Sequence, residues 1–271
     1  RLYQRRAETV KALDHLQEFL FLLRSRQHKC CFFLTPDLLE ILPLAVENDV
    51  LPEVASRLAH DYFGCDIRID GQLVPHLQIS LLGPFRLRIA ENSWIEGSSL
   101  GGPGRHLLVL LVFAPGQQFS VDAIYGRIWP DSSPDRARQN FDSTLLRLRK
   151  ALDEGCEVGA GRSYLAVERG ILFLRHARVD AIDYKVHVES GRTLQRRGDL
   201  WQACHQLLAA DLLWQGRMME GFDLPGDLFE KQEVFDELRF EQIELFAGLS
   251  EPFCSSIDLE ALLLQGLHAD P

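Results

Sequence analysis

The fold of this chain is decided at residues 133–152, which read SPDRARQNFDSTLLRLRKAL. Ser133 can cap a first helical turn, Pro134 suits a position whose N–H needs no partner, and Asp135 meets the positive end of the helix dipole. Apolar residues then recur at steps of four, four, three and four, which places them on one side of a helix. The predicted buried stripe consists of Ala137, Phe141, Leu145, Leu148 and Leu152.

The opposite face of this predicted helix is polar and basic, with five Lys/Arg against two Asp in residues 134–152. Its outermost residues are Arg136, Gln139, Ser143, Leu146, Arg147 and Lys150. Its flanks carry Arg138, Asp142 and Arg149 on one side and Asn140 and Thr144 on the other. Such a face can grip a nucleic-acid duplex, but it is also typical of an ordinary amphipathic surface helix, so the neighbouring segments must decide between the two interpretations.

Length and composition indicate a folded protein of two or three domains. The chain has 271 residues, of which 46% are hydrophobic and 25% charged. It contains no apolar run near the roughly 20 residues that a membrane span needs, and no secretory signal pattern, so we expect a cytoplasmic protein. Because it begins with Arg1 rather than Met, we also expect it to be part of a longer protein.

The charge is distributed unevenly along the chain. The formal net charge is −10, yet residues 77–180 carry 13 Lys/Arg and 11 Asp/Glu, a net of +2. Residues 211–271 carry 3 against 14, a net of −11. Since an acidic surface repels phosphate, any contact with nucleic acid is predicted for the middle of the chain.

No residue pattern indicates a cofactor, a metal site or catalysis. The six cysteines include no C-x-x-C pair, and the adjacent Cys30 and Cys31 would chelate poorly. The glycines at 101, 102 and 104 lack the spacing of a phosphate-binding loop. Most of the histidines are scattered singly, with none paired to a nucleophile by a known motif. We therefore predict that the protein is not an enzyme.

The first segment, residues 1–75, is predicted to be helical and to end in a linker. Leucine and phenylalanine recur at helical spacing near residues 13–23, and two further short helices follow Pro36 and Pro52. Residues 65–75, CDIRIDGQLVP, are polar and contain glycine, which indicates a connection between domains. This segment resembles the end of a helical-repeat array or a helical linker domain.

Residues 76–179 are predicted to form a winged helix-turn-helix. Residues 77–89 alternate as two short strands would, with a further short strand possible at 94–100, and helices are predicted at 105–114, 121–129 and 133–152. Two apolar runs then flank the turn at Glu168-Arg169-Gly170, where glycine can supply a positive φ, so a hairpin is expected at 162–174. This hairpin would be the wing.

Residues 180–271 return to helical patterns. Helices are predicted at 181–197, 198–212, 227–249 and 256–267, and their lengths suggest tetratricopeptide-like packing. The predicted fold class is thus mainly α with a small β component.

These segments resemble a known family of bacterial regulators. The middle of the chain resembles the OmpR-type winged helix in LLGPFRLRI at 81–89, SLGGPGRHLLVLLVFAPGQQFSVDAIYGRIWPD at 99–131 and NFDSTLLRLRKAL at 140–152. The helical part resembles the bacterial transcriptional activator domain of SARP-type regulators in VDAIDYKVHV at 179–188, LLWQGRMMEGFDLPG at 212–226 and ALLLQGLHADP at 261–271. Residues 33–60 look like the junction in large MalT-like regulators, so the chain would be the C-terminal part of such a protein, with its activator domain truncated.

The resemblance implies a set of DNA-binding residues. Asp142, Ser143 and Leu146 match positions that face bases, and Asn140, Thr144, Arg147 and Arg149 match positions that hold phosphates. Together with the other outward residues, the full predicted set is Arg138, Gln139, Asn140, Asp142, Ser143, Thr144, Leu146, Arg147, Arg149, Lys150, Arg162 and Arg169. Many relatives carry a polar group where this chain has Leu146, which can contact a thymine methyl but cannot pair with guanine.

The leading hypothesis is a sequence-specific transcriptional regulator that binds double-stranded promoter DNA. Its acidic helical domain would serve dimerisation, contact with RNA polymerase or restraint by upstream domains. The alternative is a protein–protein interaction module whose degenerate winged helix does not bind DNA, which the acidic charge and the exposed Leu146 favour. Operator sequence, inducing signal and direction of regulation are not encoded in any pattern that we recognise.

Overall fold

The structure is a computed structural model, and it describes residues 2–26, 35–154 and 159–253. Within these residues the chain is mainly helical with three small sheets, as the predicted fold class requires. It divides into two compact units, Arg1–His76 and Leu77–Pro271. The two units are described separately below.

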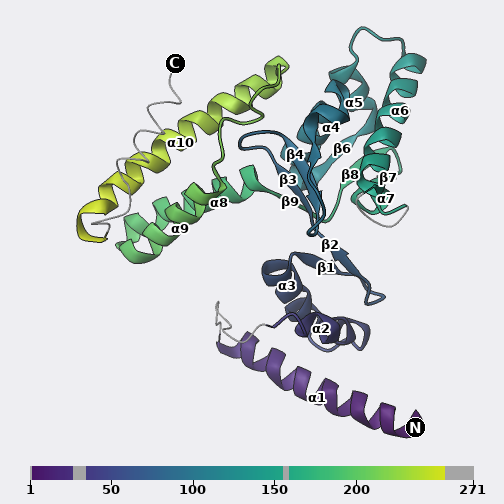
Figure 1. The fold of residues 1–271 in the computed structure, drawn as a ribbon, viewed down its shortest axis with the longest axis vertical. Helices are drawn as coiled ribbons and strands as arrows, with labels where there is room; N and C mark the ends of the chain where they lie inside the picture. Colours follow the sequence, from purple (N-terminus) through teal and green to yellow (C-terminus); the bar gives the residue numbers. More distant parts are fainter. Residues whose placement is uncertain (1, 27–34, 155–158, 254–271) are drawn as a thin grey trace. The chain divides into compact units, whose positions relative to one another are not determined.

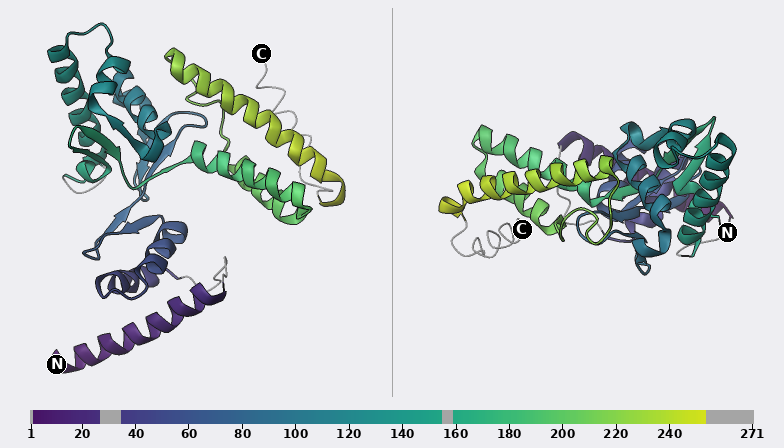
Figure 2. Two further views of the ribbon diagram at one scale, coloured as in Figure 1. Left: turned by 180° about the vertical axis from the view of Figure 1, so that it is seen from behind. Right: turned by 90° about the horizontal axis from the view of Figure 1, so that it is seen from above.

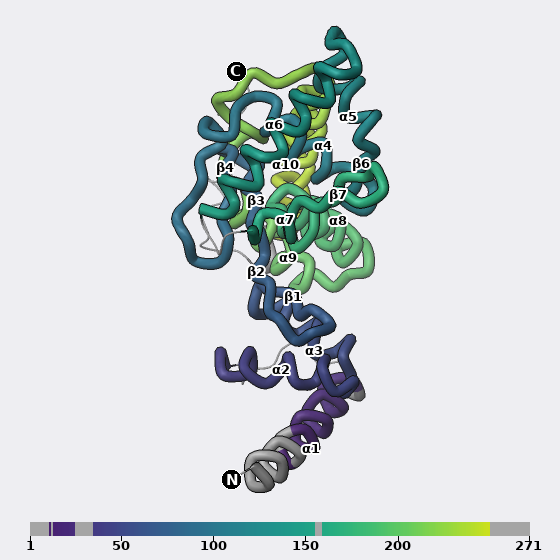
Figure 3. The backbone as a smooth tube through the Cα atoms, turned by 90° about the vertical axis from the view of Figure 1, so that its right-hand side faces the viewer, coloured from purple at the N-terminus to yellow at the C-terminus, as the bar shows by residue number. Residues whose placement is uncertain are grey.

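The first unit is built from three helices, labelled in Figures 1 and 3. They are α1 (Leu2–Arg26), α2 (Leu38–Glu47) and α3 (Pro52–Phe63). Their core is small and aliphatic, with Leu20, Leu42 and Ala59 fully buried. Gly64 ends α3 in the left-handed conformation, at φ 62°, and turns the chain into a strand.

Residues 65–75 form a hairpin, whereas the sequence predicted a polar connection. Strand β1 (Cys65–Ile67) pairs antiparallel with β2 (Leu73–Pro75). The residue before the hairpin and the residue after it extend the pairing, because the N–H of His76 donates to the carbonyl of Gly64 at 2.8 Å. Cys65 buries its side chain against the helices, so this segment belongs to the core of the first unit.

The second unit begins with a four-stranded sheet in the order β5-β4-β3-β9. Its strands are β3 (Leu77–Ser80), β4 (Arg86–Ile89), β5 (Ile95–Glu96) and β9 (Ala177–Val179). The predicted pair at 77–89 is confirmed, while the strand expected at 94–100 is only two residues long before a 3-10 turn begins at Gly97. Strand β9 was not predicted. It lies about 100 residues after β3 in the chain and pairs with β3 in parallel.

Three helices and a second sheet follow, and Figure 1 shows α4, α5 and α6 lying together beside β6, β8 and β7. The helices are α4 (Gly102–Phe113), α5 (Val121–Ile128) and α6 (Pro134–Asp153), and the strands are β6 (Gln118–Ser120), β7 (Leu165–Glu168) and β8 (Ile171–Leu174). The predicted hairpin is confirmed, with Arg169 and Gly170 both at positive φ in the turn. Strand β6 was not predicted; it joins the hairpin by pairing with β8.

Ser120 and Ser133 occupy the N-cap positions of α5 and α6 with extended backbone, but neither side chain makes the expected capping hydrogen bond. The first intrahelical hydrogen bond of α6 runs from the N–H of Ala137 to the carbonyl of Ser133 at 2.8 Å, which fits Ser133 as the N-cap residue. The helix begins where the sequence predicted, because Pro134 and Asp135 still suit its first turn.

The remaining described residues form three helices: α8 (Asp180–Arg197), α9 (Leu200–Leu213) and α10 (Gly226–Phe253). Figure 2 shows α10 running alongside α8 and α9. Gly191 lies where α8 crosses α9, because an added Cβ would come within 2.7 Å of the Leu207 side chain. The helix predicted at 256–267 lies outside the described residues, as do Cys30, Cys31 and the matching segment 261–271.

Asp180 ties this helical segment to the first sheet. Its carboxylate accepts hydrogen bonds from the N–H groups of Leu81 and Leu82 and from the hydroxyl of Ser80, at 2.8–3.1 Å. Burial raises the pKa of this carboxyl, although those hydrogen bonds act in the opposite direction. The predicted domain boundary at 179/180 would therefore separate strand β9 from Asp180, whose hydrogen bonds hold α8 to the same sheet.

Candidate nucleic-acid interface

Helix α6 is anchored by the apolar stripe that the sequence predicted. Ala137, Phe141, Leu145, Leu148 and Leu152 are each at most 5% exposed. Phe141 packs edge-on against Tyr125 of α5, with ring centroids 5.6 Å apart. Because α4 and α5 both contact α6, the stripe holds the helix with its opposite face outward.

The outward face presents cations that are not neutralised locally. Arg136, Arg138, Arg147 and Lys150 are exposed, and none forms an ion pair with an acidic side chain among the residues described here. Arg147 makes only a 3.3 Å contact to the carbonyl of Ser143, one turn back on its own helix. The charge of this face is therefore available to an anionic partner.

Two predicted contact residues do not belong to that face. Thr144 is 3% exposed, so its hydroxyl cannot reach a phosphate as predicted. Arg149 is partly buried, and both Nε and Nη2 donate to the carbonyl of Leu165, at 2.9 and 2.6 Å. Burial, and then the nearby Arg162, lower its pKa. Arg149 therefore fastens the start of β7 to α6. The two predictions are corrected because the Thr144 side chain is buried and the Arg149 guanidinium is held by the hairpin.

The polar residues of the outward face are exposed or half-buried. Gln139, Asp142 and Ser143 are exposed, and Asn140 is half-buried. The Ser143 hydroxyl lies 2.8 Å from the carbonyl of Gln139 and 3.0 Å from that of Asn140, so it donates back to its own helix. Leu146, in the same row, is 66% exposed, so this face carries one apolar side chain among its cations and polar groups.

The hairpin places one of its two predicted cations at the tip. Arg169 is exposed in the β7–β8 turn. Arg162 is also exposed, but it lies on the short helix α7 (Gly161–Tyr164) that precedes the hairpin, so the prediction that it belongs to the wing strands is wrong. Near the strand ends, Arg175 pairs with Glu168 at 2.9 Å and is less available to a ligand.

The first turn of α10 contacts the helices around α6. Asp227 lies 3.5 Å from Arg127 of α5 and 3.5 Å from His106 of α4. The guanidinium of Arg105 lies over the Phe222 ring, 4.2 Å from its centroid. The acidic helical segment thus touches α4 and α5 and pairs with Arg127, whereas no ion pair among the described residues involves a cation of α6.

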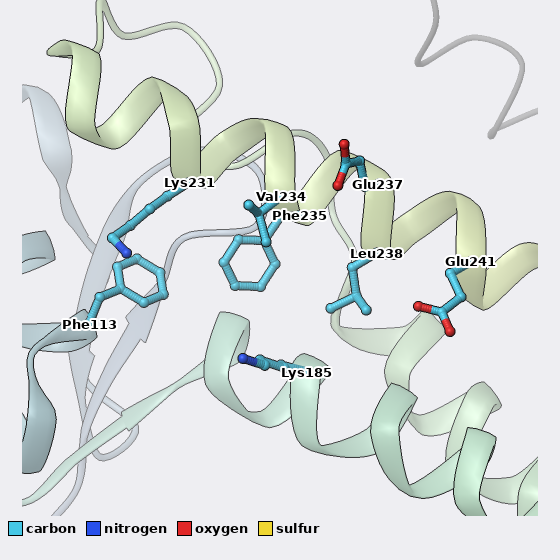
Figure 4. Close-up of a pocket in the computed structure, with 8 residues that line it drawn as sticks. All are labelled: Phe113, Lys185, Lys231, Val234, Phe235, Glu237, Leu238 and Glu241. Atoms are coloured by element: carbon cyan, nitrogen blue, oxygen red, sulfur yellow. The ribbon is translucent and has the colours of Figure 1, made fainter.

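A groove of about 320 Å³ lies between α8, α10 and the end of α4, and Figure 4 shows its lining. Phe113 and Phe235 approach each other at its apolar end, with ring centroids 5.8 Å apart, and Lys231 lies over Phe113. The other lining residues are Lys185, Val234, Glu237, Leu238 and Glu241. The lining thus combines two lysines, two glutamates and four apolar side chains.

A further cluster escaped the sequence analysis. His60, Asp66 and His76 come together in the first unit, with all their candidate ligand atoms within 4.8 Å of one another. The spacing of these residues matches no metal-binding motif, so only the hairpin register reveals them. Cys65, beside Asp66, is directed instead into the core, and burial followed by Asp66 raises the pKa of its thiol to about 11.

Comparisons with known proteins give little beyond these observations. No protein-family model matches the chain, and no curated protein matches it. A solved structure of Mycobacterium tuberculosis EmbR in complex with a low affinity phosphopeptide is similar over 72% of this chain and 66% of that chain, at 19% identity and a TM-score of 0.47. The chain thus spans just under two thirds of that protein's length. Among the described helices, none is both long and apolar enough to cross a membrane.

Proposed function

We propose that the protein is a sequence-specific DNA-binding transcriptional regulator of the SARP type. The observation that carries this proposal is the outward face of α6, where exposed cations without acidic partners among the described residues flank polar side chains. A second support is the order of elements around it, since α5, α6 and the β7–β8 hairpin follow one another as in a winged helix-turn-helix.

In the proposed mechanism, α6 lies in the major groove of a duplex. Asp142, Ser143 and Leu146 would face base edges and Arg147 would hold a phosphate, because all four are exposed on the side of the helix opposite its buried stripe. Arg136, Arg138 and Lys150 would neutralise phosphates on the two sides of the groove, and Arg169 would reach a phosphate from the hairpin. Phosphate contacts position the helix, while base contacts supply the specificity.

Helices α8–α10 would have a different role in this proposal. The segment that contains them is acidic overall and would repel DNA phosphates. Its contacts with the DNA-binding helices include Asp227, in the first turn of α10, with Arg127 of α5. We therefore propose that they dimerise with a second copy of the chain, contact RNA polymerase, or transmit restraint from upstream regulatory domains to the DNA-binding helices. The proposal requires no cofactor and no catalytic activity, and it places the protein in the cytoplasm.

A direct test uses the full chain and a duplex found by selecting bound sequences from random DNA. Arg147→Ala and Lys150→Ala should each weaken binding by about tenfold, as expected for losing about 1–3 kcal/mol of a base contact or a similar phosphate contact. Arg197→Ala is a matched control, because it removes an exposed cation at the C-terminal end of α8. Equal affinities for all three variants and the unchanged protein would remove α6 from the interface.

The alternative function is a protein–protein interaction module. Leu146 favours it, because a leucine that is 66% exposed on the outermost row of the helix can anchor a protein partner. Salt separates the two proposals. A DNA complex held by the phosphate contacts proposed above would lose about 10²- to 10³-fold in affinity between 50 and 200 mM salt, at a slope of about −0.9 per contact, whereas an apolar contact through Leu146 changes little.

A further inference from the structure

We propose that His60, Asp66 and His76 form a binding site for a divalent transition metal ion such as Zn²⁺. The site lies within the first unit and shares no residue with the proposed DNA interface in the second, so the two proposals are tested separately. Its members come from α3, from β1 and from the residue that follows β2.

The fold brings the three residues together by simple geometry. Asp66 pairs with Val74 in the hairpin, so Asp66 and His76 lie on the same face of the two strands, one step apart on the diagonal. His60 lies on the last turn of α3, four residues before the left-handed Gly64 reverses the chain into β1. The turn at Gly64 therefore carries the helix end over that face of the hairpin.

The distances suit a shared ion. Nδ1 of His60 lies 2.9 Å and Nε2 of His76 lies 3.1 Å from the same oxygen, Oδ1 of Asp66. The two imidazole centroids are 4.4 Å apart. Ligand atoms bound tetrahedrally at 2.0–2.1 Å from zinc are separated by about 3.3 Å. The two nitrogen–oxygen distances are a few tenths of an ångström shorter than this, and all the ligand atoms lie within 4.8 Å of one another.

Hydrogen bonds alone do not satisfy the cluster. His76 is 2% exposed, and its Nδ1 is buried without a hydrogen-bond partner among the described residues. A neutral imidazole buried in this way is a poor choice for packing, since one ring nitrogen stays unsatisfied. Coordination of a metal through Nε2 would leave the proton on Nδ1, so the convergence of the three ligand atoms, and not this unpaired nitrogen, carries the proposal.

The donor set selects the class of metal. Two imidazole nitrogens and one carboxylate oxygen suit zinc and its neighbours, while magnesium and calcium prefer oxygen ligands throughout. The side chain of His60 is 54% exposed and that of Asp66 is 29% exposed, so the site opens to solvent, where water can complete the coordination. A bound ion would clamp the hairpin to α3.

The test is a zinc titration of the full chain after treatment with a chelator. We expect one binding event that Asp66→Asn and His60→Gln each weaken by more than about 100-fold, beyond the 10- to 100-fold cost of losing an outer-shell partner. Both changes lie on the open side of the cluster, which protects the fold, and circular dichroism will verify it. Zinc should also raise the midpoint of thermal unfolding in the unchanged protein but not in these variants.

His205→Gln is the matched control, because His205 is an exposed histidine on α9 and should leave zinc binding unchanged. Cobalt as a second probe reports the ligand type, since nitrogen and oxygen ligands give weak visible bands without an intense thiolate charge-transfer band. The proposal is overturned if the unchanged chain does not bind zinc, if Asp66→Asn and His60→Gln bind it as the unchanged chain does, or if the cobalt spectrum shows cysteine ligation.

Discussion

The arginines of α6 and those of the α8–α10 segment differ in what surrounds them. Arg147 on α6 is exposed and contacts only the backbone of its own helix. On the helical segment, Arg192 pairs with Glu241, and Arg239 pairs with Asp211 at 2.7 Å. Arg217, which precedes α10, donates to Asp236 through Nε at 2.8 Å. Arginine is thus unpaired at Arg147 and neutralised at Arg192, Arg217 and Arg239, although Arg196 and Arg197 at the end of α8 are also exposed without an acidic partner among the described residues.

This difference shows that the number of charges in a segment does not determine where a nucleic acid can bind. Residues 211–271 carry a net of −11, and the arginines among them are held in ion pairs. Residues 77–180 are almost neutral overall at +2, yet one helix face there exposes unpaired cations. Availability of charge decides the binding surface, and availability depends on neighbours from elsewhere in the chain.

The largest expected effect comes from breaking the most deeply buried of these ion pairs. Arg239 is 3% exposed and donates to Asp211 and to Gln242, which is itself fully buried. Arg239→Ala should lower the free energy of unfolding by about 3–5 kcal/mol, because it leaves a partly buried carboxylate unpaired. Urea denaturation measures this change.

The control for Arg239→Ala is Lys185→Ala, which removes the exposed partner of Glu189 one turn away on α8. Exposed pairs of this kind contribute about 0.3–0.5 kcal/mol. If both variants unfolded at the same urea concentration, the ion pairs of the helical segment would not differ from surface charges, and the contrast with α6 would lose its basis.

The next effect compares two arginines on α6 itself. Arg149→Ala should cost about 1.5 kcal/mol or more in unfolding free energy, since two nitrogens of a charged group lose the Leu165 carbonyl. Arg147→Ala should change stability by less than about 0.5 kcal/mol, as exposed substitutions do. Equal stability losses for the two variants would contradict the assignment of Arg149 to the hairpin contact.

The salt dependence of DNA binding should also differ between the cations of α6 and those of the helical segment. In a plot of log affinity for duplex DNA against log salt, Lys150→Ala should reduce the slope by about 0.9, the contribution of one phosphate contact. Arg192→Ala should leave the slope unchanged, because its charge is already paired with Glu241. A reduced slope in the Arg192 variant would place the helical segment on the DNA.

The smallest expected effect is a gain. Leu146→Arg adds a cation to the outermost row of α6, and we expect DNA affinity to rise by about fivefold, equivalent to about 1 kcal/mol at the low end of a base contact. Val186→Arg is the control, since Val186 is also an exposed aliphatic residue, 54% exposed, but lies on α8. Loss of DNA binding in Leu146→Arg would show that the leucine side chain itself contacts the duplex.

Much of the second unit could be predicted from local pattern. Helix α6 begins and ends within one residue of the prediction, and every residue of its predicted apolar stripe is buried. The β7–β8 turn was equally clear, because Gly170 supplies a positive φ at the point where two alternating runs meet. These features depend on contacts between residues close together in the chain.

Three-residue strands could not be predicted in the same way. Strands β6 and β9 are too short to show alternation, and each exists because a distant strand pairs with it. The hairpin at 65–75 was mistaken for a linker, because its polar turn dominates the composition. Pairing between distant residues leaves little trace in either partner alone.

The features of the candidate sites also fall into those that the local sequence pattern predicted and those that depend on distant residues. The periodicity of the sequence by itself determined which side of α6 is buried, since residues three and four apart share a face in any α-helix. Only the tertiary structure decided that Thr144 is buried, that Arg149 serves the Leu165 carbonyl, and that His60 and His76 meet at Asp66. The reason is physical: a helical repeat fixes the direction of each side chain about the helix axis, whereas burial and hydrogen bonding depend on which other segments of the chain pack against the helix.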